Sequence, residues 1–132
     1  VDIKNPEYLQ FKDKNCEIIG YTHEISALKK ALDNFDELNI EGILILLKDE
    51  IIAFSVFSKL NHNTADVHFE KYNTEIKGAA QIINWETAKY LSEKYEYINR
   101  EQDLAIPGLQ KAKKSYSPEY MLYTYRLYRK KN

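Results

Sequence analysis

The junction between a strand pattern and a helix pattern at residues 65–94 constrains the fold more than any other feature of this 132-residue chain. Apolar and polar residues alternate from Ala65 to Glu70, as in a half-buried β-strand. A short polar loop follows, and a helical pattern begins directly after Gly78. The free N–H groups and the dipole of a helix N-terminus favour an anion, and glycine lets a ligand approach the backbone closely. The junction therefore predicts a strand, an anion-binding loop and a helix, in that order.

The sequence before the junction predicts a helix followed by a three-stranded meander. Residues 1–21 carry helix breakers and are expected to be irregular. Thr22 is a candidate N-cap for an amphipathic helix that ends at residues 39–42. The three strands that follow are expected at 43–47, 51–60 and 65–71.

The strand patterns also predict which faces are buried. The run 43–47 is entirely apolar, so this strand is expected to be buried on both faces. Strand 51–60 is expected to form a hairpin with it. Strict alternation on strand 65–71 places its apolar and polar side chains on opposite faces of the sheet. The apolar set is Ala65, Val67 and Phe69, and the polar set is Asp66, His68 and Glu70.

Two helices and two strands are predicted from the junction onward. A helix at 78–94 is followed by a strand at 95–99. A short helix begins at Pro107, which suits the first helical position, and stops before Pro118. A last, tyrosine-rich strand is expected at 120–129. The expected fold class is α+β, with a mixed β-sheet and helices on both of its faces.

Composition limits the class of protein. A chain of 132 residues with 44% hydrophobic and 30% charged residues fits one globular domain, 1–132. The single cysteine, Cys16, excludes an internal disulfide and a cysteine-rich metal site. No apolar run approaches the roughly 20 residues of a membrane helix, and no secretory signal pattern opens the chain. We therefore expect a cytoplasmic protein; a start at Val1 leaves open whether further sequence precedes it.

Charge is distributed unevenly along the chain. Residues 100–132 contain eight Lys or Arg and three acids, a net charge of +5, whereas residues 1–99 carry −6. Such asymmetry fits an anionic partner, and it also fits a solvated helix face with a lysine-rich terminus. The side chains that could contact phosphate groups are Arg100, Lys111, Lys113 and Lys114.

Three short motifs follow one another on the predicted elements: the loop 75–80, Asn99 after the next strand, and an Ala-x-x-x-Tyr pattern ending at Tyr116. They resemble the acyltransferases of the GNAT superfamily, in which a Gln/Arg-x-x-Gly-x-Gly/Ala loop receives the coenzyme A pyrophosphate. Gly78 and Ala80 match that loop, and Glu75 stands where the superfamily has Gln or Arg. The resemblance implies that the residues in contact with the cofactor are Ile76, Lys77, Gly78, Ala79, Ala80 and Asn99.

A closer resemblance covers roughly residues 24–129. The segments that carry it are 31–35, 67–71, 78–84 and 99–104, which runs on to 108–113. They are similar to a largely uncharacterised bacterial family related to the C-terminal catalytic domain of phosphatidylglycerol lysyltransferases. Those domains consist of two GNAT-like halves and move an amino acid from aminoacyl-tRNA to a lipid head group. The resemblance implies that this chain is the second half of a longer tandem protein.

The function implied is transfer of an acyl or aminoacyl group from acyl-coenzyme A or aminoacyl-tRNA to an amine or a hydroxyl. Glu70 ends its strand just before the loop, where a carboxylate can take the proton of an attacking amine. The alternative is a solvent-facing or ion-paired carboxylate. The resemblance makes Tyr116 the general acid toward the leaving group, and the alternative is a core tyrosine.

A competing hypothesis is a non-catalytic GNAT-like binding or scaffold module. Such a module would stabilise a second GNAT-like half, form a homo-oligomer or recognise a phosphate ligand. A metal site was also considered, since Asp66, His68 and Glu70 share one strand face. Residues two apart on a strand have Cα atoms about 7 Å apart, and three ligands from one strand seldom converge. No metal site is therefore predicted.

Overall fold

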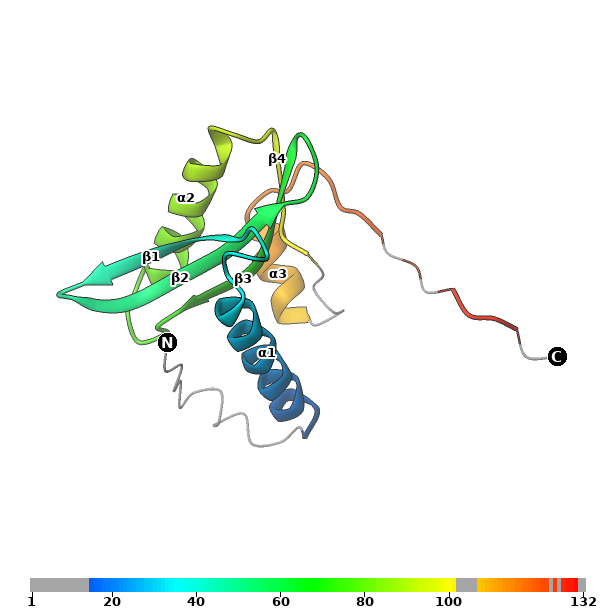
Figure 1. The fold of residues 1–132 in the computed structure, drawn as a ribbon, viewed down its shortest axis with the longest axis horizontal. Helices are drawn as coiled ribbons and strands as arrows, with labels where there is room; N and C mark the ends of the chain where they lie inside the picture. Colours follow the sequence, from blue (N-terminus) through cyan, green and yellow to red (C-terminus); the bar gives the residue numbers. More distant parts are fainter. Residues whose placement is uncertain (1–14, 102–106, 124, 126, 131–132) are drawn as a thin grey trace. The chain divides into compact units, whose positions relative to one another are not determined.

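The computed structural model describes residues 15–101, 107–123, 125 and 127–130 (Figure 1). Contacts divide the chain into two compact units, Val1–Glu101 and Gln102–Asn132. The first unit contains the mixed sheet and two helices, and the second contains one helix. None of the helices in the described ranges has the length and apolar character needed to cross a membrane.

The sheet has four strands in the order β1-β2-β3-β4. The first three form the antiparallel meander that was predicted, and the fourth runs parallel to β3 after a helical crossover. The strands are β1 (Glu41–Leu47), β2 (Glu50–Lys59), β3 (Thr64–Tyr72) and β4 (Tyr97–Asn99). This mixed sheet with helices confirms the predicted α+β class.

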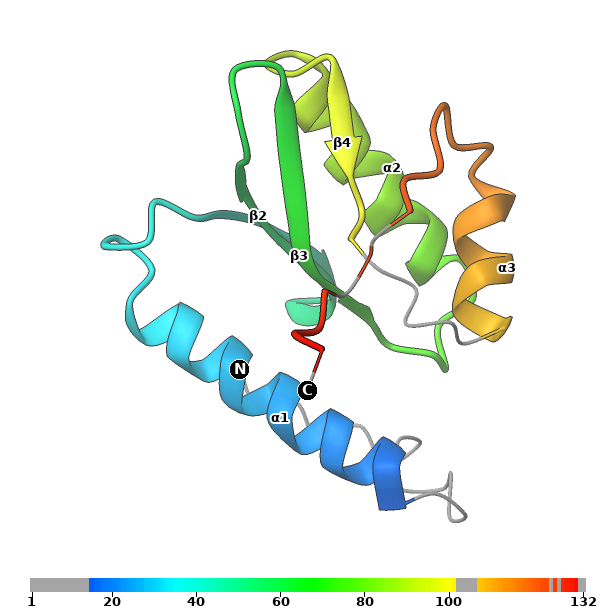
Figure 2. The same ribbon diagram turned by 90° about the vertical axis from the view of Figure 1, so that its right-hand side faces the viewer.

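Helices α1 (Asn15–Asp33) and α2 (Ala79–Ser92) cover opposite faces of the sheet (Figures 1 and 2). A core cluster on the α2 face joins Leu91 to apolar residues of β2 and β3. A second cluster on the α1 face joins Leu28 to Phe54 and Val56 of β2. The sheet therefore separates two apolar layers, each closed by one helix.

A β-bulge in the β2–β3 pair changes which face each residue of β3 occupies. Phe57 pairs with Val67, but Val56 pairs with Phe69, so His68 is an extra residue on β3. Val67 accordingly packs in the cluster on the α2 face, whereas Phe69 packs in the cluster on the α1 face. The predicted strict alternation is therefore wrong beyond His68, because one extra residue reverses the faces of all that follow.

One other boundary and one burial differ from the sequence predictions. Helix α1 begins at Asn15, so residues 15–21 are helical rather than irregular. Gly20, taken as a helix breaker, lies inside the helix, where a glycine is costly but tolerated. β1 is not buried on both faces, since Leu44, Leu46 and Leu47 are exposed. This strand lies at the sheet edge, and one of its half-buried side chains, Ile43, packs in the cluster on the α2 face.

The second unit contains α3 (Pro107–Ser115), which starts at the proline as predicted. The expected strand at 120–129 is wrong for the described residues of that segment, because none of them is in a strand. Their large side chains are exposed, with Leu127 at 96%. An alternating apolar pattern forms a strand only where another strand offers its backbone groups.

Candidate functional site

The loop between β3 and α2 is organised by Asn73. Its side-chain oxygen accepts a hydrogen bond from the Glu75 amide at 3.0 Å, and its carbonyl accepts one from the Ile76 amide at 3.2 Å. Its own amide donates to the carbonyl of Ile52 at 2.7 Å, which ties the loop to β2. A turn in which an Asn side chain binds the backbone two residues on has a fixed shape. The loop thus presents a defined backbone to the start of α2.

Helix α2 begins without a side-chain cap. Gly78 occupies the N-cap with φ of 86°, a left-handed conformation that glycine adopts without steric cost. The Ala79 amide donates to the carbonyl of Ile76 at 3.1 Å, but within the described ranges the amides of Ala80 and Gln81 have no backbone acceptor. A Cβ atom added at Gly78 would meet nothing within 4 Å. The helix start therefore offers open N–H groups that an anion could accept.

The other predicted loop residues differ in exposure. Lys77 and Gly78 are exposed, whereas Ile76 and Ala80 are half-buried. Ala79 is buried, with 1% exposure, so only its backbone could meet a ligand. The loop and the helix start thus come together as predicted, and binding of a cofactor by these residues stays a prediction.

The Glu70 side chain lies on the α2 side of the sheet in an ion pair with Arg100. Arg100 Nη2 donates to Glu70 Oε1 at 2.8 Å, and Nη1 donates to Oε2 at 3.1 Å. Nη1 also donates to Oδ1 of Asn84, on α2, at 2.6 Å. Glu70 is thus an ion-paired carboxylate, the alternative given for it in the sequence analysis. Through Arg100, which follows β4, the Glu70 side chain of β3 is connected to α2.

The parallel pairing of β3 with β4 is short. It joins Thr64 to Tyr97, Ala65 to Ile98 and Asp66 to Asn99, and β3 then continues to Tyr72 without a described partner on that side. The sheet thus opens beyond Asp66, next to the start of α2.

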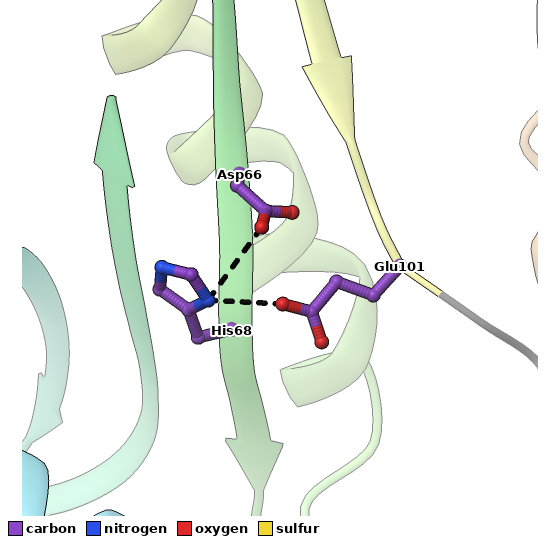
Figure 3. Close-up of side chains that lie close together, drawn as sticks. All are labelled: Asp66, His68 and Glu101. Carbon is purple, nitrogen blue, oxygen red and sulfur yellow. Dashed lines mark hydrogen bonds and ion pairs between the residues drawn. The ribbon is translucent and has the colours of Figure 1, made fainter. Parts of the chain in front are cut away.

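On the α1 side of this opening, His68 meets two carboxylates (Figure 3). Its Nδ1 atom lies 2.9 Å from Oε1 of Glu101 and 3.7 Å from Oδ2 of Asp66. Its Nε2 atom lies 2.7 Å from Oγ of Ser58 on β2. Burial raises the pKa of Glu101, the hydrogen bond with His68 lowers it, and the nearby Asp66 carboxylate raises it further.

Two predicted site residues have local roles in the structure. Asn99 ends β4, and its side-chain oxygen accepts a hydrogen bond from the Glu101 amide at 3.0 Å. That contact is the strand-end capping expected of an asparagine, and its pantetheine role stays a prediction. Tyr116 belongs to the second unit, directly after α3, and is 40% exposed. Its role as an acid also stays a prediction.

The family model described as "Phosphatidylglycerol lysyltransferase, C-terminal" matches residues 5–128. The chain belongs to this family. A comparison with curated proteins gave no match.

Solved structures confirm the fold of this member of the family. A conserved protein of unknown function from Bacteroides thetaiotaomicron VPI-5482 is 42% identical, with a TM-score of 0.77 over 87% of this chain and 38% of that one. A ribosomal-protein-alanine N-acetyltransferase from Brucella melitensis biovar Abortus 2308 is 13% identical, with a TM-score of 0.53 over 70% and 74% of the chains. An aminoglycoside N-acetyltransferase in complex with CoA is 12% identical, with a TM-score of 0.58 over 83% and 92%.

These likenesses confirm the GNAT-like fold and its relation to the lysyltransferase C-terminal family. The chain spans 38% of the length of its Bacteroides relative. The remote acetyltransferases share its architecture at low identity and therefore report on the fold alone.

Sequence reasoning missed two contacts of the site. Arg100 was a candidate for phosphate contacts, but it binds Glu70 and Asn84. Glu101 was given no role, yet its carboxylate reaches His68. Arg100 and Glu101 are the two residues that follow β4. Because β4 runs parallel to β3, the residues at its end lie beside β3. Their position after the predicted strand was the signal that could have identified them.

Proposed function

We propose that this chain is a GNAT-type transferase domain that moves an acyl or aminoacyl group to an amine or hydroxyl acceptor. The donor is acyl-coenzyme A or an aminoacyl-tRNA. The observation that carries the proposal is the opening of the sheet beyond Asp66 beside the uncapped start of α2 at Gly78. Membership of the lysyltransferase C-terminal family supports an aminoacyl donor, and the CoA complex of a structural neighbour supports coenzyme A. Both donors fit a cytoplasmic protein.

In this proposal the donor phosphates lie against residues 76–80, where the dipole and the N–H groups of α2 meet them. Asn99 contacts the arm that carries the acyl group. The acceptor nitrogen or oxygen attacks the acyl carbon, Glu70 takes its proton, and Tyr116 protonates the leaving thiolate or ribose oxygen. Arg100 donates one hydrogen bond to each oxygen of Glu70, so the acceptor would use a lone pair that the guanidinium leaves open.

Thermal melting with coenzyme A, acetyl-coenzyme A and aminoacyl-tRNA, each added alone, tests the donor site. We expect one donor to raise the melting temperature, because a ligand that binds only the folded state stabilises it. Gly78→Glu should abolish that shift by placing a carboxylate at the anion site. Gly78→Ala is the matched control, since it has the same backbone strain and no charge. A donor that still stabilises Gly78→Glu fully would refute the assignment of the loop.

Turnover with a donor found in this way tests the proposed base. We expect Glu70→Gln to reduce the rate by about 100-fold or more, the usual contribution of general base catalysis. A wild-type rate in this variant would show that Glu70 is not the base.

The second candidate is a binding or scaffold module without turnover. The ion pair between Arg100 and Glu70 favours it, because the pair satisfies the proposed base internally. No shift with any donor, together with a dimer in sedimentation velocity or a stable complex with a separately expressed GNAT-like half, would support this function.

A further inference from the structure

We propose that Asp66, His68 and Glu101 form a binding site for a divalent transition-metal ion such as Zn²⁺ or Mn²⁺. Each of the three side chains offers one ligand atom, and these atoms lie within 4.8 Å of one another. They come from β3 and from the residue that follows β4, and they point toward a common position (Figure 3). The three residues lie on the α1 side of the sheet, at the point where the pairing of β3 with β4 ends, and none of them belongs to the loop or the helix start.

The spacing of the ligand atoms suits such an ion. Bonds of about 2.0–2.2 Å place the ligands of a tetrahedral or octahedral ion roughly 3–3.5 Å apart. His68 Nδ1 already lies 2.9 Å from Glu101 Oε1 and 3.7 Å from Asp66 Oδ2. Small rotations of the three side chains would therefore bring all the ligand atoms to bonding distance of one ion. One imidazole and two carboxylates are donors that Zn²⁺ and Mn²⁺ share, whereas Mg²⁺ prefers oxygen alone.

Ser58 provides the support that a metal-binding histidine requires. A ligating imidazole usually donates its other N–H to a fixed acceptor, which sets the tautomer and the ring orientation. Ser58 Oγ lies 2.7 Å from His68 Nε2 and can accept that hydrogen bond. With this tautomer, His68 Nδ1 directs its lone pair at the position between the two carboxylates, where a cation replaces the proton of the hydrogen bond to Glu101.

Asp66 gives a second, independent indication. Its side chain is 14% exposed, and its Oδ1 atom is buried without a hydrogen-bond partner among the described residues. A buried carboxylate oxygen without a partner is costly, and coordination of an ion through both Asp66 oxygens would remove that cost.

The proposed ion would keep positions that the protein does not fill. Three protein ligands leave at least one position of the ion for water or another small ligand, as in catalytic metal centres. The ion would also link β3 to the residue after β4 at the point where their pairing ends.

Isothermal titration of the metal-free chain with ZnCl₂, MnCl₂ and MgCl₂ tests the proposal. The protein is used without an affinity tag and with the Cys16→Ser substitution, so that neither a tag nor the thiol binds zinc. We expect one Zn²⁺ or Mn²⁺ per chain with a Kd in the micromolar range or tighter, much weaker binding of Mg²⁺, and a higher melting temperature with the bound ion.

Substitutions distinguish the proposed ligands from other groups. We expect His68→Asn and Glu101→Gln each to weaken binding at least tenfold, whereas His62→Asn and Glu75→Gln, both at exposed loop positions, should leave it unchanged. Glu101→Gln is the safer variant for folding, because this side chain is 43% exposed, and circular dichroism checks both. No binding by the unsubstituted cluster, or an affinity in His68→Asn and Glu101→Gln equal to that of the unsubstituted cluster, would overturn the proposal.

Discussion

The Arg100 guanidinium holds both oxygens of the Glu70 carboxylate, at 2.8 and 3.1 Å, although the two residues are 30 positions apart. Paired hydrogen bonds between a guanidinium and a carboxylate fix both planes as well as the distance. The same guanidinium reaches Asn84 at 2.6 Å, so it joins β3 to α2. Glu70 is 12% exposed and Arg100 27% exposed, which makes this contact more protected from water than a surface ion pair.

Removal of this guanidinium should destabilise the fold. Arg100→Ala leaves a largely buried carboxylate and an amide oxygen without their donor, and we expect a loss of about 1–3 kcal/mol in the free energy of unfolding. Urea denaturation monitored by circular dichroism measures it. Arg129→Ala is the matched control, because Arg129 is exposed, and it should have little effect. Equal stability of both variants would show that the ion pair contributes nothing to the fold.

Gly78 should resist replacement for reasons of backbone conformation alone. Gly78→Ala places an L-residue at φ of 86° but causes no clash, so we expect a loss of about 1 kcal/mol. Gly108→Ala, in α3, also meets no atom within 4 Å and should be neutral or stabilising by up to about 1 kcal/mol. Chemical denaturation of both variants gives the comparison, and a Gly78→Ala protein as stable as the wild type would contradict the strained N-cap.

Leu91 should be among the most sensitive core positions. It is fully buried in the cluster on the α2 face, and Leu91→Ala creates a cavity that we expect to cost about 2–5 kcal/mol. Leu122, 83% exposed, provides the control, and Leu122→Ala should change stability by less than about 0.5 kcal/mol. The two midpoints in urea would then differ clearly; coinciding midpoints would argue against the packing of α2 on the sheet.

Lys94 gives a prediction about pH. Its ammonium group donates to the Tyr90 hydroxyl at 3.1 Å and to Glu41 Oε1 at 3.4 Å, and these hydrogen bonds raise its pKa above 10.5. A raised lysine pKa means that the stabilisation is complete below the unfolded-state pKa and is lost as pH rises through the folded-state pKa. NMR titration of the Lys94 side chain should therefore give a pKa above that of an unfolded control.

The effect of Lys94 on stability should be small, because the group is exposed and screened by water. The difference in melting temperature between wild type and Lys94→Met should stay constant from pH 7 to pH 10 and shrink at higher pH. A difference that grows above pH 10 would have the wrong sign for a raised pKa.

The elements that could be predicted from the sequence are those whose patterns involve residues close together in the chain. Apolar spacing predicted α1 and α2, short polar turns predicted the meander, and the glycine before α2 predicted the shape of the junction. These features depend on residues within one or two turns of each other. The open start of α2 therefore lies where the sequence pattern placed it.

The bulge at His68 could not be predicted in this way, because it is a property of the register between β2 and β3. Nothing in the alternation of residues 65–70 marks an extra residue, and only the pairing of Val56 with Phe69 reveals it. The contacts of Glu70 and His68 depended on that bulge, since it turns them to opposite sides of the sheet. Their partners, Arg100 and Glu101, are more than 25 residues away and follow a separate strand.

The extra residue in β3 also separates two groups that strict alternation would place on the same side of the sheet. His68 lines the cavity beneath α1, and Glu70 contacts α2 through the Arg100 guanidinium, although only Phe69 stands between them in the chain. A substitution in one of these two environments can therefore leave the other unchanged. Without the extra residue both side chains would face the same way, so the length of this strand governs which groups meet the same ligand.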